Sequence, residues 1–531
     1  MARSPGHTRA TPPVQLGFVI DQSQCIGCHA CTVACKSENH VPVGNFRTWV
    51  KYTEKGSFPS VKRSFSVMRC NQCTDAPCVT ICPVSALEKR GDGIVDVDPK
   101  ACIGCKSCMQ GCPYDALYLN EDHGTVEKCH FCAHRTEQGL APACAVVCPT
   151  EAIIPGDFHD PESRVSQMRK EFGLEARKTE AGTGPNVLYR DVAPTNIDPL
   201  ASNAAGGFIW AGRQPGIDVA THEFQAMEAK AEARTVYDVA HPALWGAKIT
   251  GYLFTKSLAA GVFLAALFGG LSPFTSRAAE GNSSADTVSG GLIAFFGLLF
   301  LAATSILLVA DLKRPERFLY ILRRPNWSSW LVRGTYALMA YGATLSIWAV
   351  TSFFGMALGD VSRTLLTGFG VISGSLAACY TGWLFGQAKG RVLWMRRGLW
   401  AHLIVQAVVA GAAFLLLLSS VTDLGVGSVE SLRNVLTAWL GLHAVFVLFE
   451  GRMAPKKRER EFAQAHALMT EGPFAQRHWG AGLGIGVVVP FVLLVLPVWG
   501  PATFLAALCA LIGLWVEEDV LVRAGQALPI S

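Results

Sequence analysis

The stretch 102–113, CIGCKSCMQGCP, places four cysteines at the spacing C-x2-C-x2-C-x3-C and ends on a proline. The stretch 25–35, CIGCHACTVAC, repeats the spacing, with Lys36 where the other has Pro113. Two further groups have longer spacings, and together the groups hold 16 of the 18 cysteines: Cys25, Cys28, Cys31, Cys35; Cys70, Cys73, Cys78, Cys82; Cys102, Cys105, Cys108, Cys112; Cys129, Cys132, Cys144, Cys148. Sixteen thiols make four sets of four.

The spacing of the first and third groups is typical of bacterial ferredoxins, which hold [4Fe-4S] clusters. Three thiolates on one tight loop reach three irons of a cubane, and the fourth points toward a second cluster. The near-identical runs CIGCHAC and CIGCKSC indicate an internal duplication. The repeat predicts an α+β ferredoxin-like domain of two tandem two-cluster modules with four [4Fe-4S] clusters, and the spacing alone leaves the pairing between groups open.

Other uses of these cysteines fit the pattern less well. A structural zinc site favours two separated C-x2-C pairs and would leave cysteines over. Disulfides need an oxidising compartment, and the first 21 residues show no export signal. The fourth group, CHFCAHRTEQGLAPACAVVCP at 129–149, has eleven residues between its second and third cysteines. Because loop closure costs grow slowly with length, we expect an intact motif with an inserted loop, a candidate surface for a partner.

The four groups, in this order, resemble the electron-transfer beta subunits of the molybdopterin oxidoreductase superfamily, such as dimethyl sulfoxide, polysulfide and nitrate reductases. The resemblance covers about residues 15–190. It implies a chain of clusters between a separate molybdopterin-containing catalytic subunit and the membrane, with the pair from groups one and four nearer that partner. The implied ligand sets are Cys25, Cys28, Cys31, Cys148; Cys35, Cys129, Cys132, Cys144; Cys70, Cys73, Cys78, Cys112; and Cys82, Cys102, Cys105, Cys108.

The second half of the chain is apolar and predicts an all-α polytopic membrane bundle. About eight segments are long enough to span a bilayer, near 246–271, 288–310, 329–355, 364–387, 398–420, 430–450, 480–498 and 500–516. The predicted organisation is a four-cluster domain at 1–190, a linker or tether at 191–245 with turn-forming runs, and a transmembrane domain at 246–531.

The basic residues favour one orientation. The chain has a net charge of +5, but the positive residues of the second half lie in short loops between apolar segments, which indicates membrane topology rather than nucleic-acid binding. Loops on the side of the cysteine half carry fifteen lysines and arginines: Lys313, Arg314, Arg317, Arg323, Arg324, Lys389, Arg391, Arg396, Arg397, Arg452, Lys456, Lys457, Arg458, Arg460 and Arg477. The other side carries only Arg277, Arg363 and Arg433. We therefore expect an inner, cytoplasmic-membrane protein with its cysteine half in the cytoplasm.

The stretches DLKRPERFLYILRRPNWSSWLVRG at 311, YLFTKSLAAG at 252 and RAGQALP at 523 resemble the polysulfide reductase-type membrane anchor, the NrfD family. The resemblance covers about 240–531 and implies an eight-helix bundle that binds ubiquinone or menaquinone without haem. Ionisable groups inside a membrane are costly and mark function. The candidate quinone-binding residues are Tyr252, Lys256, Arg333, Tyr336 and His402.

For some polar residues of the apolar half, a structural role has to be weighed against a functional one. Lys256 lies about ten residues into its segment, too deep for easy snorkelling. Asp311 is expected to pair with nearby arginines. His443 and Glu450 share one helix face seven residues apart and could relay protons, although packing is the expected role of the histidine.

The combined prediction is an electron-transfer and membrane-anchor subunit of a cytoplasm-facing molybdenum or tungsten oxidoreductase, with no catalytic residues of its own for the primary substrate. Two alternatives stay open. One is a component of another respiratory complex, similar to alternative complex III, which would have multihaem cytochromes as partners. The other is a redox-driven proton translocator that uses Lys256, Asp311, His443 and Glu450.

Overall fold

The computed structural model describes residues 14–57, 59–203, 233–271, 285–356, 358–422, 424, 426–496 and 500–531. The start of the chain, most of the expected linker (204–232), the loop with Arg277 and part of the PVWGP turn lie outside these residues. The chain forms two compact units. One runs to Pro242 and includes Pro529–Ser531, and the other comprises Ala243–Leu528.

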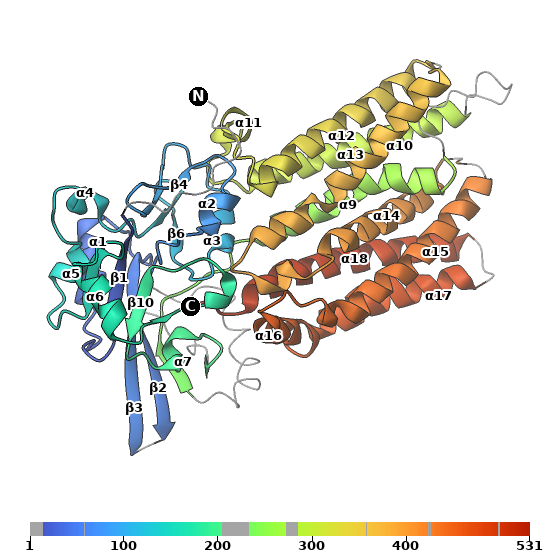
Figure 1. Ribbon diagram of the computed structural model, residues 1–531. Helices are drawn as coiled ribbons and strands as arrows, with labels where there is room; N and C mark the ends of the chain where they lie inside the picture. The colour runs from blue at the N-terminus through green and yellow to red at the C-terminus, as the bar shows by residue number, and fades with distance from the viewer. Residues whose placement is uncertain are drawn as a thin grey trace. The chain divides into compact units, whose positions relative to one another are not determined.

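The first unit contains short helices and small sheets (Figure 1). Its elements are β1 (Leu16–Asp21), α1 (Ala30–Glu38), β2 (Thr48–Ser57), β3 (Ser60–Arg69), α2 (Pro77–Ile81), β4 (Leu87–Lys89), β5 (Val95–Val97), α3 (Ser107–Gly111), β6 (Leu117–Asn120), β7 (Thr125–Lys128), α4 (Ala133–Thr136), α5 (Ala143–Val146), β8 (Ile153–Asp157), α6 (Arg164–Glu171), β9 (Glu175–Ala176), η1 (Thr179–Ala181), β10 (Val187–Arg190), α7 (Pro194–Ile197), β11 (Ser202–Asn203) and β12 (Ala233–Tyr237).

Strand β1 organises one sheet, in the order β8-β1-β10-β9. Its sequence LGFVID is almost wholly buried, and it pairs antiparallel with β8 and parallel with β10. A continuous apolar run suits a strand that is covered on both faces. Residues after the last cysteine therefore complete the core of this unit.

The second sheet has the order β11-β12-β2-β3. Strand β12 pairs antiparallel with β2, and the Trp49 side chain donates a hydrogen bond to Asp238 at 2.9 Å. This strand lies within the segment 191–245 that was expected to be a linker. Its sequence ARTVY places Ala233 and Thr235 in the interior, so the segment contributes buried surface as well as a connection.

Each cysteine group ends at a short helix. Helices α1, α2, α3 and α5 carry Cys31, Cys78, Cys108 and Cys144 in their first two turns. Gly27 and Gly104 occupy equivalent places in the repeated runs and have φ values of 71° and 67°. This left-handed conformation is easiest for glycine and turns each loop tightly enough for its cysteines to converge.

The second unit is a bundle of long helices that run side by side (Figure 1). Its elements are α9 (Ala247–Phe268), α10 (Ala285–Ala310), η3 (Pro315–Arg317), α11 (Tyr320–Arg323), α12 (Trp330–Phe353), α13 (Asp360–Gln387), η4 (Val392–Met395), α14 (Leu399–Leu418), α15 (Val426–Phe449), η5 (Glu450–Arg452), α16 (Glu459–Thr470), the π-helix η6 (Gln476–Val488), α17 (Val489–Val495) and α18 (Pro501–Ala527).

Six helices among the described residues are long and apolar enough to cross a membrane: Ala247–Phe268, Gly290–Ala310, Asp360–Gln387, Leu399–Leu418, Gly427–Arg452 and Gln476–Val495. The other two expected segments form the long helices α12 and α18. Phe295, Leu299 and Ile306 on α10 are exposed at helical spacing, as expected of a surface that faces lipid. The sequence and structure therefore indicate a multi-pass membrane region.

Small residues let the inner helices approach closely. A Cβ atom on Gly261 of α9 would lie 1.9 Å from the carbonyl oxygen of Ala407 on α14. Gly486 of η6 and Gly513 of α18 face each other in the same way. Such contacts are typical of helix packing in membranes, and here they bring the polar residues of α9, α14, η6 and α18 into one interior.

Candidate functional site

The first unit contains four separate cavities, each lined by four cysteines. We name them by one member: the Cys28 cavity (Cys25, Cys28, Cys31, Cys148), the Cys132 cavity (Cys35, Cys129, Cys132, Cys144), the Cys73 cavity (Cys70, Cys73, Cys78, Cys112) and the Cys105 cavity (Cys82, Cys102, Cys105, Cys108). The structure thus brings together the same four sets that the resemblance implies. All 18 cysteines are described, and none of them forms a disulfide.

The cavities follow one another in a fixed order. Cys31 of the Cys28 cavity is close enough to Cys144 of the Cys132 cavity for their charges to interact. Gln72, next to Cys73, donates a hydrogen bond to the carbonyl oxygen of Cys129 at 2.9 Å. At the other end, Cys108 interacts electrostatically with Cys78. The order is therefore Cys28, Cys132, Cys73, Cys105.

Two buried cations lie where neighbouring cavities meet. Arg69 has no exposed surface, and its Nη1 donates a hydrogen bond to the Sγ of Cys144 at 3.4 Å. Its charge also acts on Cys31 of the adjoining cavity. Lys128 is buried and its charge acts on both Cys129 and Cys70. Arg69 thus places positive charge beside the Cys28 and Cys132 cavities, and Lys128 places it beside the Cys132 and Cys73 cavities.

Without a bound metal these thiols stay protonated at neutral pH. Burial, together with the neighbouring cysteines, raises the pKa of Cys31 to about 11 and the pKa values of Cys105 and Cys112 to about 12. Backbone N–H groups of Ala86 and Ala152 each donate to a cysteine sulfur at 3.3 Å. Bound iron would take the place of the thiol protons, and these donors would stabilise the resulting negative charge. The residues present fit iron-sulfur clusters.

Among the five expected quinone-binding residues, Tyr252 and Lys256 lie together. Both are buried, one helical turn apart on α9, and both reach α13. The Tyr252 hydroxyl contacts the hydroxyls of Tyr380 and Thr381, the latter at 2.8 Å. The Lys256 ammonium group donates to the carbonyl oxygen of Ala378 and lies 5.6 Å from the Tyr380 ring.

Arg333 and Tyr336 lie elsewhere, at the start of α12. Arg333 is exposed, and its Nε donates to the carbonyl oxygen of Trp327 at 2.8 Å. Tyr336 stacks on the Trp327 ring with 4.8 Å between centroids. No contact joins them to Lys256 among the described residues. Their positions are those of helix-end side chains held by the preceding loop.

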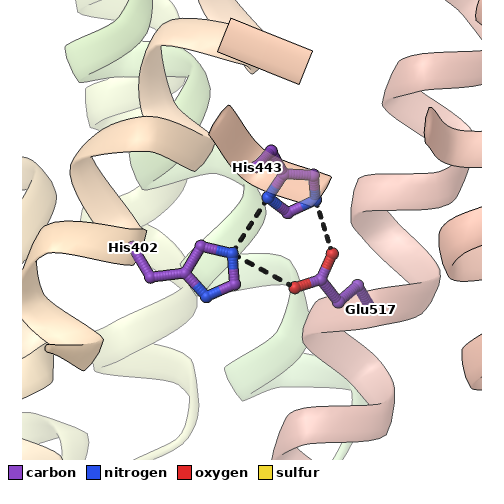
Figure 2. A group of neighbouring side chains, drawn as sticks. All are labelled: His402, His443 and Glu517. Atoms are coloured by element: carbon purple, nitrogen blue, oxygen red, sulfur yellow. Dashed lines mark hydrogen bonds and ion pairs between the residues drawn. The ribbon is translucent and has the colours of Figure 1, made fainter. Parts of the chain in front are cut away.

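His402 belongs to a different group, which Figure 2 shows with His443 and Glu517. His402 Nε2 lies 2.9 Å from His443 Nδ1, and His443 Nε2 lies 2.8 Å from Glu517 Oε2. All three side chains are buried, and they come from α14, α15 and α18. His443 was expected to have a packing role, and the structure places it between two polar partners.

The acidic run Glu517-Glu518-Asp519 in α18 was missed in the sequence. Three adjacent acids in an otherwise apolar helix are a usable signal, because each is costly in a membrane. Asp519 is neutralised by Arg477 at 2.5 Å and Arg523 at 2.9 Å. Glu518 accepts a hydrogen bond from Ser257 at 3.1 Å and interacts with the charge of Lys256, so it connects the acidic run to α9.

Comparison with known proteins matches each of the two parts of the chain to a family model. The family model of the 4Fe-4S dicluster domain matches residues 61–158. The model of the polysulphide reductase, NrfD family matches residues 235–529, more than half of the chain. The first match agrees with the cysteine cavities, so the first unit is an iron-sulfur domain.

Relatives of the first unit are iron-sulfur subunits of reductases. The B subunit of tetrathionate reductase from Salmonella typhimurium is 41% identical over 205 residues, which cover 38% of this chain and 82% of the relative. Arsenate respiratory reductase iron-sulfur subunit ArrB of a Shewanella species is 37% identical over 224 residues, 33% of this chain and 96% of the relative. A putative iron-sulfur B subunit of dimethyl sulfoxide reductase from Halobacterium salinarum is 40% identical over 203 residues, 33% and 78% of the two chains.

The cysteine cavities, the long apolar helices and these matches lead to one assignment. The chain belongs to the NrfD polysulphide reductase family of membrane proteins, and it carries in the same polypeptide an iron-sulfur domain similar to the iron-sulfur subunits of reductases.

Proposed function

We propose that this chain is the electron-transfer and membrane-anchor subunit of a molybdopterin oxidoreductase. It carries electrons through four [4Fe-4S] clusters between a separate catalytic subunit and quinone in the cytoplasmic membrane. The observation that supports this most strongly is the ordered row of four cavities, each lined by four cysteines. The relatives named as reductase iron-sulfur subunits support the presence of a catalytic partner.

The proposed ligand sets are those of the four cavities. The bound clusters supply one-electron transfer, and the chain's own residues set the environment in which it occurs. Arg69 and Lys128 place positive charge beside Cys144 and Cys129, both in the Cys132 cavity. A buried positive charge favours the more negative, reduced form of a cluster, so these two residues should raise the potential there.

The catalytic subunit is proposed to bind beside the Cys28 cavity. Cys28 is the one exposed cysteine among the 18. The apolar side chains of Ile26, Val33, Val146 and Val147 are also exposed, on the cysteine loop, α1 and the end of α5. Helices α1 and α5 pack against each other, so these exposed side chains lie on neighbouring elements. Exposed apolar patches of this kind mark protein interfaces, and this one surrounds the most accessible cluster position.

The quinone is proposed to bind beside Lys256 and Tyr252, with Tyr380 from α13 completing the site. Lys256 is fully buried, and its ammonium group donates to the carbonyl oxygen of Ala378. A buried ammonium group with a single carbonyl partner has donors left for a quinone oxygen. Arg333, Tyr336 and His402 remain candidates by sequence, but their observed partners favour Lys256 and Tyr252 as the first contacts.

The proposed topology has eight spans, with α12 and α18 added to the six apolar helices, and places the basic loops in the cytoplasm. Two of the three basic residues expected on the opposite side have local partners. Arg363 pairs with Asp360 at 2.8 Å, and Arg433 donates to the carbonyl oxygens of Leu494 and Leu496. The positive-inside rule counts lysines and arginines and not net charge, so the count of fifteen against three is what supports this orientation.

The function is tested by anaerobic purification of the chain with its native partners. We expect molybdenum or tungsten in a co-purifying protein, and we expect dithionite-reduced clusters to be reoxidised by menadione. Absence of both metals from the complex, together with clusters that menadione leaves reduced, would contradict the proposal. Multihaem cytochromes in place of a pterin protein would instead identify a different respiratory complex.

A further inference from the structure

The interior of the bundle contains more polar groups than quinone binding requires. Five buried side-chain atoms there have no hydrogen-bond partner in the described structure: Gln406 Oε1, Glu450 Oε1, His478 Nδ1, His478 Nε2 and Glu518 Oε2. Buried polar atoms are almost always paired, with protein or with ordered water. Their concentration in one region of the bundle therefore indicates a function.

The protons of the histidine pair can be placed by elimination. An arginine guanidinium is always a donor, and Arg396 Nη2 lies 2.9 Å from His402 Nδ1. His402 Nδ1 must therefore accept, and in the neutral ring the proton is on Nε2. That proton points to His443 Nδ1 at 2.9 Å, which leaves the His443 proton on Nε2, facing Glu517. The two rings thus form a series of hydrogen bonds that all run in one direction and end on the Glu517 carboxylate.

This series of hydrogen bonds argues against a metal site at His402, His443 and Glu517, although two histidines and a carboxylate are a common metal-ligand set. A histidine that binds metal through Nε2 normally donates its Nδ1 proton to a carbonyl or carboxylate. Here Arg396 occupies that position as a donor, so Nε2 of His402 keeps its proton. Instead, His443 and Gln406 together hold the Glu517 carboxylate, Gln406 with a hydrogen bond of 2.9 Å.

Glu517 connects to both ends of the polar region. Toward the interior, the next residue is Glu518, which is hydrogen-bonded to Ser257 and interacts with Lys256. Toward the helix ends, His478 on η6 interacts electrostatically with both Glu517 and Glu450. His478 Nε2 lies 3.6 Å from Glu450 Oε1, and the partly exposed His466 lies 3.7 Å from the same oxygen.

Arginine cannot release a proton, so Arg396 blocks a route through His402 and Glu450. Arg396 pairs with Glu450 and fixes that carboxylate instead. The unpartnered atoms of His478 and Glu450 offer the other route toward Glu517, because His478 interacts electrostatically with both carboxylates. Glu450 begins η5 after α15, and His478 lies in the first turn of η6, so this route leads to one end of the bundle.

We infer that Glu517, His478 and Glu450 form a proton path between Glu518, which interacts with Lys256 at the proposed quinone site, and water at the end of the bundle beside His466. The inference rests on the proposed quinone site. Reduction of a quinone to a quinol takes two electrons and two protons, and the iron-sulfur clusters supply electrons alone. The path exchanges these protons at one end of the bundle only, so it serves quinone chemistry and is not a transmembrane pump. His402 and His443 are positioning residues for Glu517.

The test compares two oxidants on the complete, purified complex. The clusters are reduced with dithionite and then mixed with menadione, which needs protons, or with ferricenium, which accepts an electron without one. We expect His478→Gln and Glu517→Gln to slow reoxidation by menadione at least tenfold and to leave reoxidation by ferricenium unchanged. Formic acid, a small proton carrier, should restore part of the lost rate. The matched control is Glu461→Gln, a buried carboxylate paired with Arg458 at the base of α16, which should leave both rates unchanged.

Several results would overturn the inference. Wild-type rates with menadione in both variants would remove these residues from the path, and equal slowing with ferricenium would mean that the clusters are damaged. A metal ion beyond cluster iron that is lost on His443→Gln would make Glu517 a ligand. Failure of the wild-type protein itself to react with menadione would instead refute the quinone site on which the path depends.

Discussion

Arg69 donates a hydrogen bond to the Sγ of Cys144 at 3.4 Å from a side chain with no exposed surface. The arginine also interacts with Cys31, a ligand position of the adjoining cavity, and its guanidinium lies 4.2 Å from the centre of the Phe18 ring. One permanent positive charge therefore acts on two neighbouring cavities. This relationship gives a direct way to perturb the clusters without removing a ligand.

Arg69→Gln should lower the reduction potentials of the clusters in the Cys28 and Cys132 cavities. Loss of a buried positive charge destabilises the reduced state, and we expect a shift on the order of 60 mV, a tenfold change in a one-electron equilibrium. Redox titration followed by electron paramagnetic resonance measures it. The control is Arg164→Gln, because Arg164 is exposed and pairs with exposed Glu151. Unchanged potentials with full cluster content would contradict the prediction.

Cys144 and Cys148 are four residues apart but line different cavities. Cys144→Ser should alter the same cluster resonance as Cys132→Ser, because Cys144 and Cys132 line the same cavity. Cys148→Ser should alter a different resonance, from the Cys28 cavity. If both substitutions changed the same signal, the two cysteines would share a cluster and the assignment of ligands to these cavities would be wrong.

Lys256→Met should weaken binding of menadione at least tenfold and leave the clusters intact. The ammonium group is the buried charged donor of the proposed site, and a hydrogen bond to a charged group contributes about 1.5–3 kcal/mol. Titration of the reduced complex with menadione measures the effect. Lys248→Met is the matched control, since Lys248 lies on the same helix but is exposed and bonds to the carbonyl oxygen of Ala310. Equal affinities in the wild type and Lys256→Met would remove Lys256 from the site.

His241 makes the stability of the first unit depend on pH. Burial lowers its pKa, but Asp115 at 2.5 Å and Asp238 outweigh this and raise the pKa to about 10. The unfolded value is about 6.5, so the stabilisation is complete below pH 6.5 and is lost as the pH rises to 10. About a quarter of the side chain is exposed, and screening reduces the contribution to about 2 kcal/mol.

We therefore expect His241→Gln to lower the thermal unfolding midpoint by about 5 °C at pH 6.5 and by much less near pH 10. Loss of cluster absorbance on heating gives the midpoint in the complete protein. An equal decrease at both pH values would show that the histidine acts through packing and not through its charge.

The iron-sulfur half was predictable because its ligands follow local rules. Spacing of two and three residues constrains a loop around a cluster, and the repeat at Cys25 and Cys102 made the pattern explicit. The pairing between groups came from family resemblance, because contacts such as Cys35 with Cys129 depend on the path of the whole chain. Strand β12 was missed for a related reason, since its partner β2 lies about 180 residues earlier.

The long helices were also predictable from apolar length, but their internal contacts were not. Lys256 was found because one charge in an apolar segment is conspicuous. Its neighbours on α13 and α18, Ala378 and Glu518, depend on how glycines allow helices to pack, which no single segment reveals. Arg333 and Tyr336 had suitable chemistry, but their contacts with Trp327 hold them at the helix start.

The most direct test of the central claim is a count of iron and acid-labile sulfide in the anaerobically purified protein. Four cavities that each hold a [4Fe-4S] cluster predict about sixteen irons and about sixteen sulfides per chain. A content of about eight of each, or zinc in place of iron, would contradict a four-cluster path through the Cys28, Cys132, Cys73 and Cys105 cavities.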